Sequence, residues 1–203
     1  EKYDIRLIYL YIKTEHGIFK DTKEIELNNL SKYLTDSSST AAAVAPSMEE
    51  YEAFFADVLT QADHIIHVSL ASHAGESYHN AVMAARGFGH VHIIDSGHIS
   101  GGQALTVLYA ASLVKEGKNV REVCQAVEQV KGKISSTFLI PSAKIIKDNG
   151  YVNSAVTRLC ECFHCHPQLK MRQGKIRFTN IQIGKLENAW GRYIWQQLLF
   201  PKY

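Results

Sequence analysis

Residues 64–95 read HIIHVSLASHAGESYHNAVMAARGFGHVHIID, and this stretch decides the fold class. Residues 64–70 are mostly apolar and predict a buried strand. Residues 76–86 predict a helix that ends at Gly87, since glycine commonly follows the last helical turn. Residues 91–94 predict a second short strand. A strand, a helix and a strand joined by short connections form a β-α-β unit, so the stretch predicts an α/β fold with parallel strands.

The same alternation continues on both sides of this unit. Ser47 and Glu50 form the capping box of a helix with an apolar stripe, and Asn119 and Glu122 form a second capping box. Together the elements predict a central, largely parallel sheet flanked by helices. The further predicted strands cover residues 4–12, apolar on both faces like a buried strand, and 137–140, and the further predicted helices cover residues 27–34 and 101–115.

The pattern changes after Pro141. We expect a helical piece over residues 154–163, and then a hairpin with strands at 169–171 and 175–183 around Gln173 and Gly174. An amphipathic helix is predicted over the last segment, residues 186–199. We therefore expect two units, an N-terminal α/β domain over residues 1–133 and a smaller, partial second α/β lobe over residues 134–203.

Composition excludes several classes of protein. The chain has 203 residues, of which 46% are hydrophobic and 21% charged, so it is neither disordered nor fibrous. A formal net charge of +2 is too small to indicate nucleic-acid binding. No apolar run is long enough to span a bilayer, and three crowded cysteines without a secretory signal favour reduced thiols and a cytoplasmic location.

Three loops expected at the carboxyl-end edge of the sheet are rich in small, polar residues: 37–47, 71–77 and 95–102. Ligands bind beyond the carboxyl ends of parallel strands, and free backbone N–H groups at helix N-termini suit an anion such as a carboxylate. No glycine-rich nucleotide signature is present, so we expect no cofactor. The candidate ligand-binding residues are Ser47, Ser72, His73, Gly75, Ser77 and Ser96.

Structural roles compete with binding at each of these positions. Serine residues at a strand-to-helix turn often cap the helix, and Ser47 with Glu50 has the pattern of such a cap. Asp95 and Ser96 stand at a strand end, where they are typical turn residues. His67 lies inside a predicted buried strand, so we expect a core residue with satisfied hydrogen bonds rather than a catalytic base.

Two patterns suggest chemistry but lack essential parts. Cys160, Cys162 and Cys165 lie close to His164 and His166, yet a structural zinc site needs four ligands that converge, and no second cysteine pair exists. We expect plain thiols and no metal.

A hydrolase triad can be imagined from Ser77, His79 and Asp95. The nucleophile elbow is broken, however, because His79 stands where its last glycine belongs. We therefore expect no enzymatic activity.

An ordered series of short motifs carries a family resemblance. Their order and spacing resemble the DegV family of fatty-acid-binding proteins over most of the chain. The motifs are Ala45-Pro46-Ser47 before an aromatic helix, residues 67–78 (HVSLASHAGESY), Ile94-Asp95-Ser96 with Ser100-Gly101-Gly102, residues 138–141 (FLIP) through Asn149-Gly150, His166-Pro167, and Gly174-Lys175-Ile176.

The resemblance implies a function. Members of the family bind one long-chain fatty acid between two α/β domains, with the tail in an apolar tunnel and the carboxylate on small hydroxyl residues. Some present that carboxylate to a separate fatty-acid kinase. The resemblance therefore implies a non-catalytic lipid-binding domain.

The sequence also departs from the family's motifs. Residues without a hydroxyl, Ala43 and Val44, occupy two hydroxyl positions; Gly75 and Glu76 occupy a Ser and a Gly position, and Tyr151 replaces an arginine. The family's first strand and C-terminal part have no counterpart. An alternative is therefore a regulatory or dimerisation module of a larger protein that has lost fatty-acid binding. The sheet edge left by a missing strand would favour a homodimer.

Overall fold

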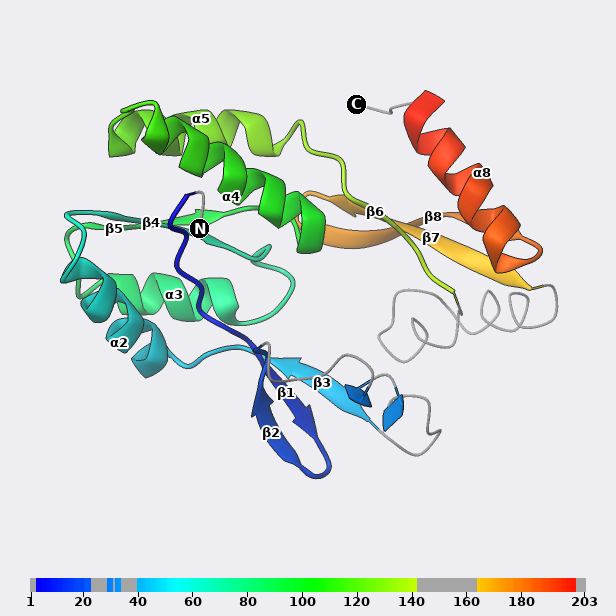
Figure 1. Ribbon diagram of the computed structural model, residues 1–203, viewed down its shortest axis with the longest axis horizontal. Coiled ribbons are helices and arrows are strands. Elements are labelled where there is room, and N and C mark those ends of the chain that lie inside the picture. The colour runs from blue at the N-terminus through cyan, green and yellow to red at the C-terminus, as the bar shows by residue number, and fades with distance from the viewer. Residues whose placement is uncertain (1–2, 23–28, 31, 34–39, 142–163, 200–203) are drawn as a thin grey trace.

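A parallel pair of strands lies between two layers of helices (Figure 1). The computed structural model describes residues 3–22, 29–30, 32–33, 40–141 and 164–199. β4 (Ile65–Ser69) and β5 (Val91–Asp95) pair in parallel, from Ile65 opposite Val91 to Ser69 opposite Asp95. α3 (Ser77–Ala85) is the crossover between them, so the predicted β-α-β unit is confirmed.

Each face of this strand pair has its own apolar core. α2 (Met48–Leu59) and α3 cover one face, and α4 (Ser100–Lys115) and α5 (Val120–Lys131) cover the other (Figure 1). Both cores remove aromatic and aliphatic side chains from water, which is the main stabilising contribution in a domain of this size. The buried members are Tyr51, Phe55, Ile65, Ala81 and Ala84 on the first face, and Ile94, Ala110, Val123 and Val127 on the second.

Both predicted capping boxes are present. The Glu50 amide donates to the Ser47 side chain, and the Ser47 amide donates to the Glu50 carboxylate. Asn119 and Glu122 exchange the same two bonds at the start of α5. These bonds satisfy N–H groups that a helix cannot pair internally, which fixes where α2 and α5 begin.

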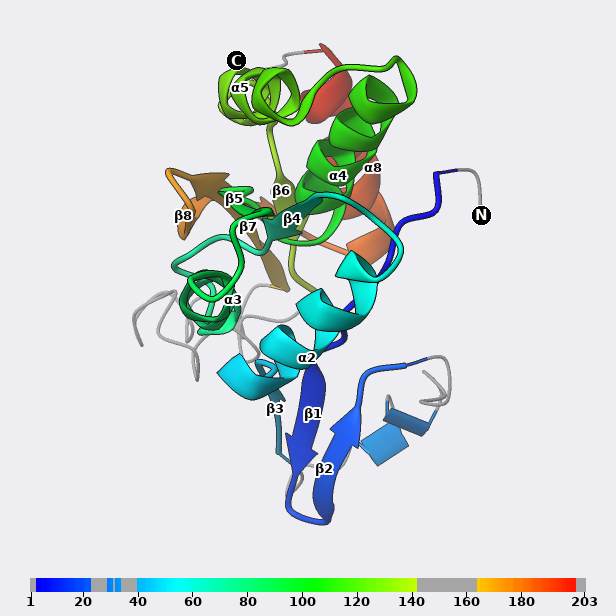
Figure 2. The same ribbon diagram turned by 90° about the vertical axis from the view of Figure 1, so that its left-hand side faces the viewer.

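A small antiparallel sheet lies at one end of the molecule, away from α5 (Figure 2). Its strands are β1 (Tyr11–Thr14), β2 (Gly17–Lys20) and β3 (Ala41–Val44), in the order β2-β1-β3. β3 leads directly into the Ser47 cap of α2, so the sheet is connected to the helical layer through residues 45–47.

The prediction of a buried strand over residues 4–12 is wrong over residues 4–10, and only Tyr11 and Ile12 belong to a strand. Residues 4–10 lie outside any strand, and Leu7 is 61% exposed. Asp4 has a φ of 49°, which is incompatible with an extended strand. Pairing with β2 and β3 begins only at Tyr11, because no described strand offers hydrogen bonds to the residues before it. Apolar composition alone does not make a strand without a partner.

A second antiparallel sheet lies in the C-terminal part. β6 (Thr137–Leu139), β7 (Cys165–Arg172) and β8 (Lys175–Ile183) follow one another in space, with β7 in the middle. The predicted hairpin is confirmed: its two-residue turn, Gln173 and Gly174, has φ values of 50° and 73°. Positive φ at both positions is what a tight hairpin turn requires.

The last helix, α8 (Leu186–Leu199), has the predicted bounds. Ala189 and Tyr193 form a small core with Leu139 of β6. The Tyr193 hydroxyl lies 2.5 Å from the Thr137 hydroxyl, which ties the helix to the same strand. α8 is thereby held against the C-terminal sheet.

The α/β class is confirmed, and the parallel pairing is more limited than predicted. Among the described strands only β4 and β5 are parallel, because the strands of the other two sheets are joined antiparallel. The predicted helix over 154–163 and half of the residues of the one over 27–34 lie outside the described residues, and the described residues 29–30 and 32–33 are helical. Within the described ranges, no helix has the length and apolar character needed to cross a membrane.

Candidate functional site

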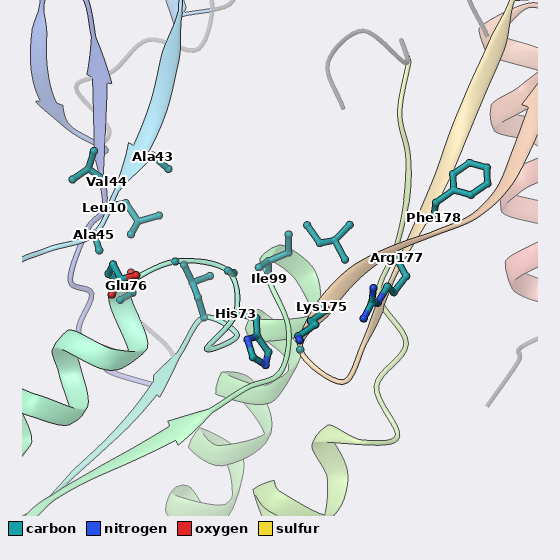
Figure 3. A pocket seen from close by; sticks show the side chains of 16 residues that line it. Leu10, Ala43, Val44, Ala45, His73, Glu76, Ile99, Lys175, Arg177 and Phe178 are labelled. Carbon is teal, nitrogen blue, oxygen red and sulfur yellow. The ribbon is translucent and has the colours of Figure 1, made fainter. Parts of the chain in front are cut away.

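A cavity of about 1100 Å³ opens beyond the carboxyl end of β4 (Figure 3). It is bounded by the loop between β4 and α3, the segment between β3 and α2, and the start of β8. Most of its lining is apolar, and a few polar side chains lie on opposite sides of it. The apolar side chains belong to Leu10, Ala43, Val44, Ala45, Leu70, Ala74, Ile99, Ile176 and Phe178, and the polar ones to His73, Glu76, Ser77, Lys175 and Arg177.

The loop from β4 to α3 turns sharply to form one wall. The Ala74 amide donates to the Ala71 carbonyl at 2.7 Å, and Gly75 follows with a φ of 147°. Side chains are strained at that φ, so glycine suits the position. Glu76 is the N-cap residue of α3, and its side chain makes no capping hydrogen bond. The backbone N–H of Asn80 donates to the Glu76 carbonyl. The N-terminus of α3 therefore faces the cavity together with an acidic side chain.

Three of the six candidate residues line this cavity: His73, Gly75 and Ser77. Ser77 is buried, and its hydroxyl forms a hydrogen bond with Tyr51. Burial raises the pKa of Tyr51, and that hydrogen bond opposes the rise, so the phenol stays protonated at neutral pH. His73 is exposed on the loop.

Ser72 lies outside the cavity lining and holds the loop in place. Its amide donates to Asp95 Oδ1 at 3.2 Å, and the Gly97 amide donates to the same oxygen at 2.8 Å. Asp95 thus joins the loop after β4 to the loop after β5. The Ser72 carbonyl lies 3.1 Å from His79 Nε2. Asp95 has the turn role expected of it.

Ser96 is also outside the lining, and its side chain already has partners. Its fully buried hydroxyl donates to the His98 carbonyl at 3.0 Å and accepts from the His98 amide at 3.1 Å. His98 Nδ1 in turn lies 2.9 Å from the Ser136 hydroxyl, and Nε2 lies 3.0 Å from the Lys131 carbonyl. This network connects the start of α4 with the end of α5. Ser47 caps α2, as described above.

His67 occupies the core as predicted, but its hydrogen bonds are not all satisfied. Its ring packs edge-on against Tyr51 and Phe55, with centroids 5.5 Å and 5.7 Å away. Nε2 is buried and has no partner among the described residues. Burial lowers the pKa of His67 to about 4, so the ring is neutral near pH 7. The residue faces α2 and belongs to the packing of that layer.

The residues considered as a hydrolase triad bond to other groups. His79 Nε2 contacts the Ser72 carbonyl, and Asp95 accepts backbone amides. Among the described residues, no hydrogen bond joins Ser77, His79 and Asp95 to one another. A nucleophile and base in hydrogen-bond reach are what a triad requires.

The cysteine-rich segment lies only partly within the described residues. Cys160 and Cys162 are outside them, and Cys165 is buried in β7. Both ring nitrogens of His166 lie 2.8 Å from backbone carbonyls, those of Pro141 and Gly184. No metal-binding group of histidine, cysteine or acidic side chains occurs in the part of the chain that the structure describes.

The contribution of the hairpin to this cavity was not expected from the sequence. Lys175 and Arg177 reach it from β8, next to Ile176 and Phe178. Figure 3 shows Glu76 on one side of the cavity and both cations on the other. The signal available was the alternation of basic and apolar residues after Gly174. This alternation predicts a strand with one basic and one apolar face, but it does not indicate which part of the protein the strand contacts.

Comparison with known proteins identifies the family. A family model described as "Uncharacterised protein, DegV family" matches residues 1–184. The chain belongs to the DegV family. The resemblance drawn from the ordered motifs is therefore confirmed.

Curated DegV relatives are longer than this chain. A DegV domain-containing protein of Deinococcus radiodurans is 24% identical over 168 residues, which cover 82% of this chain and 60% of the relative. One from Caldanaerobacter subterraneus is 24% identical over 177 residues, covering 86% and 63%. The chain thus spans less than two thirds of the length of these two relatives.

Solved DegV structures share the fold. A structure described as fatty acid binding of a DegV family protein, from Thermus thermophilus, matches with a TM-score of 0.85 at 20% identity over 99% of this chain and 72% of that one. The Fatty Acid Kinase (Fak) B3 protein of Streptococcus pneumoniae, loaded with linoleic acid, matches with a TM-score of 0.81 at 16% identity over 97% and 70%. The chain therefore has the DegV fold.

Proposed function

We propose that this chain is a non-catalytic lipid-binding domain that holds a long-chain fatty acid in the cavity between the β4–α3 loop and β8. The observation that carries the proposal is the lining: a largely apolar cavity of about 1100 Å³ with a few polar side chains, two of them cations on the hairpin side. Small-molecule sites have about 300–1,000 Å³ and the same composition, apolar walls with a few polar groups. An acyl chain with an anionic head group matches both parts.

The DegV relatives support the ligand class. The Streptococcus pneumoniae protein was loaded with linoleic acid, and a structure from Eubacterium ventriosum is described as a stearic acid-binding protein. Each methylene removed from water contributes about 0.8 kcal/mol, so the tail supplies most of the affinity. Shortening the acyl chain by two carbons should weaken binding about tenfold.

The predicted site residues take different parts in this proposal. His73, Gly75 and Ser77, which line the cavity, are proposed to contact the ligand. Ser72 and Ser96 are proposed to act through the shape of their loops, because their partners are backbone groups. For Ser47 the proposed role is the cap of α2 alone. Residues 1–133 and 134–203 are proposed as the two units that enclose the ligand.

A partner follows from the same relatives. Because one DegV relative is described as a fatty acid kinase B protein, we propose that a separate kinase acts on the bound carboxylate, in the cytoplasm. The chemistry would then belong to the partner, and this chain would present the substrate.

Mass spectrometry of an organic extract of freshly purified protein tests the proposal. We expect a long-chain fatty acid at about one per chain, or one taken up from an added mixture. Protein that stays empty in both conditions would contradict fatty-acid binding. Empty protein that elutes as a homodimer would favour the regulatory or dimerisation module. The exposed side chains Trp195 and Leu198 of α8 would then be the first surface to mutate.

A further inference from the structure

Four cations share one face of the β7–β8 hairpin. The strand register sets Arg172 opposite Lys175 and Lys170 opposite Arg177. We call these four residues the cationic face. Like charges directly opposite each other on a sheet are destabilising, so two such pairs in one short hairpin need a compensating anion or carry a cost in stability.

The other face of the same hairpin is apolar. Leu169 pairs with Phe178 and Met171 with Ile176, and Leu169 and Met171 are buried. Side chains of a strand alternate between faces, so the register that buries this apolar face also gathers the cations on the opposite one.

No carboxylate of the described residues neutralises the three cations nearest the turn. The described ion pairs involve Glu15, Glu122 and Glu128, none of which lies on this hairpin. Arg172, Lys175 and Arg177 make no side-chain hydrogen bond or ion pair within the described ranges. Their charges are therefore available to an anion from outside the chain.

Two of these cations belong to the cavity, and the turn brings them to the β4–α3 loop. A Cβ atom on Gly174 would lie 3.5 Å from the His73 ring, so the turn packs against this loop. Lys175 and Arg177 line the cavity, whereas Arg172 does not. Glu76 stands on the opposite side (Figure 3). The cavity is thus electrically asymmetric, with its cations at the hairpin and its anion at the start of α3.

We propose that Lys175 and Arg177 hold the anionic head group of the acyl ligand from the hairpin side, next to His73 and away from Glu76. This inference rests on the proposed function and assigns the residues that select for a charged head group. A carboxylate at the α3 terminus would meet the Glu76 carboxylate, and like charges at short range repel. On the hairpin side, an ammonium and a guanidinium supply charge-assisted hydrogen bonds, which are about twice as strong as neutral ones.

Binding of palmitic acid compared with cetyl alcohol tests the inference at mildly alkaline pH, where the carboxyl group is ionised. The two ligands share one tail, so their difference reports the head group. The wild-type chain should prefer the acid. Lys175→Gln combined with Arg177→Gln should weaken acid binding by about tenfold or more and leave alcohol binding within about twofold.

Arg172→Gln is the matched control. It removes one positive charge from the same face of the same hairpin, at a residue outside the cavity, so it should change acid binding by less than about threefold. Lys175→Glu combined with Arg177→Glu reverses the charge of the proposed head-group site. This variant should bind cetylamine in preference to palmitic acid, a result that a misfolded protein cannot give.

The outcomes separate the two proposals. If the wild type binds acid and alcohol equally, or if the double glutamine variant keeps the full preference for acid, the head-group assignment is wrong while lipid binding stands. If the wild type binds no acyl ligand, the proposed function fails and the head-group assignment fails with it.

Discussion

His67 combines a buried ring with an ionisable nitrogen that has no hydrogen-bond partner among the described residues. The ring fills the space between Tyr51 and Phe55, so its position is set by aromatic packing. Its buried Nε2 cannot be protonated without placing a charge in the apolar layer, and burial lowers the pKa of His67 to about 4. At mildly acidic pH, His67 is therefore neutral in the folded chain and protonated in the unfolded chain.

This difference predicts a pH dependence of stability. In the unfolded chain the pKa of His67 returns to about 6.5, so the unfolded state binds more protons as pH falls below that value. The contribution to the free energy of unfolding is complete above pH 6.5 and is lost progressively down to about pH 4, by up to about 3 kcal/mol. Urea denaturation of the wild type and His67→Phe at several pH values measures it.

The phenylalanine ring keeps the aromatic contacts and removes the titrating nitrogen. His67→Phe should therefore lose less stability than the wild type between pH 6.5 and pH 4.5. Parallel stability profiles for the two proteins would show that His67 is solvated in the folded state.

Gly102 predicts a second residue-level effect. A Cβ atom there would lie 2.0 Å from the Ser136 hydroxyl and 2.9 Å from His98 Cβ, inside the buried network that joins α4 to α5. Gly102→Ala should lower the free energy of unfolding by about 2 kcal/mol, because close contacts force shifts in a packed interior. Neighbouring Gly101 has nothing within 4 Å of its added Cβ, so Gly101→Ala should be neutral or slightly stabilising. Thermal melting of both variants tests this difference in stability. Equal melting temperatures would contradict the close contact at Gly102.

At the scale of elements, features that depend on residues close together in the sequence could be predicted, and features that depend on distant residues could not. The capping boxes at Ser47 and Asn119 could be recognised because both partners lie within four residues of each other. The bounds of α8 follow from its periodicity. The strand prediction for residues 4–10 is wrong because a strand needs a neighbouring strand to pair with, and composition does not reveal that neighbour. For the same reason the extent of parallel pairing could not be deduced from the alternation of strands and helices.

The caps give a test that separates stability from binding. Ser47→Ala and Asn119→Ala each remove one helix cap and should each cost about 1 kcal/mol of stability. Both should leave palmitic acid affinity unchanged, since neither side chain lines the cavity. A loss of affinity in Ser47→Ala that Asn119→Ala does not share would assign Ser47 a contact with the ligand. Denaturation and binding measured on the same preparations provide the comparison.

At the scale of the whole molecule, the cavity is assembled from segments far apart in the chain. Leu10, the residues after β3, the β4–α3 loop and the start of β8 meet only in the folded protein. Sequence motifs identified the loop at residues 71–77, because its composition is local. They could not identify Lys175 and Arg177 as cavity residues, since that depends on where the hairpin lies against His73.

This assembly predicts a pattern of protection in hydrogen exchange. Adding palmitic acid should slow amide exchange in residues 71–77 and 174–178 together, because both segments line the cavity proposed to hold the ligand. Amides of α5, which contributes nothing to the lining, should be less affected. Exchange followed by mass spectrometry measures this. Protection of residues 71–77 alone would mean that the hairpin takes no part in binding.

Lys175 and Arg177 also bear on how fast a ligand arrives. Two like charges that line a low-dielectric cavity attract an oppositely charged solute over a Debye length, about 8 Å at physiological ionic strength. Departure is governed instead by the apolar contacts of the tail, which salt hardly weakens. Added salt should therefore slow loading while the residence time stays nearly constant. If the proposed function holds, a chain with this arrangement captures scarce acyl anions quickly and releases them at a rate set by another part of the same cavity.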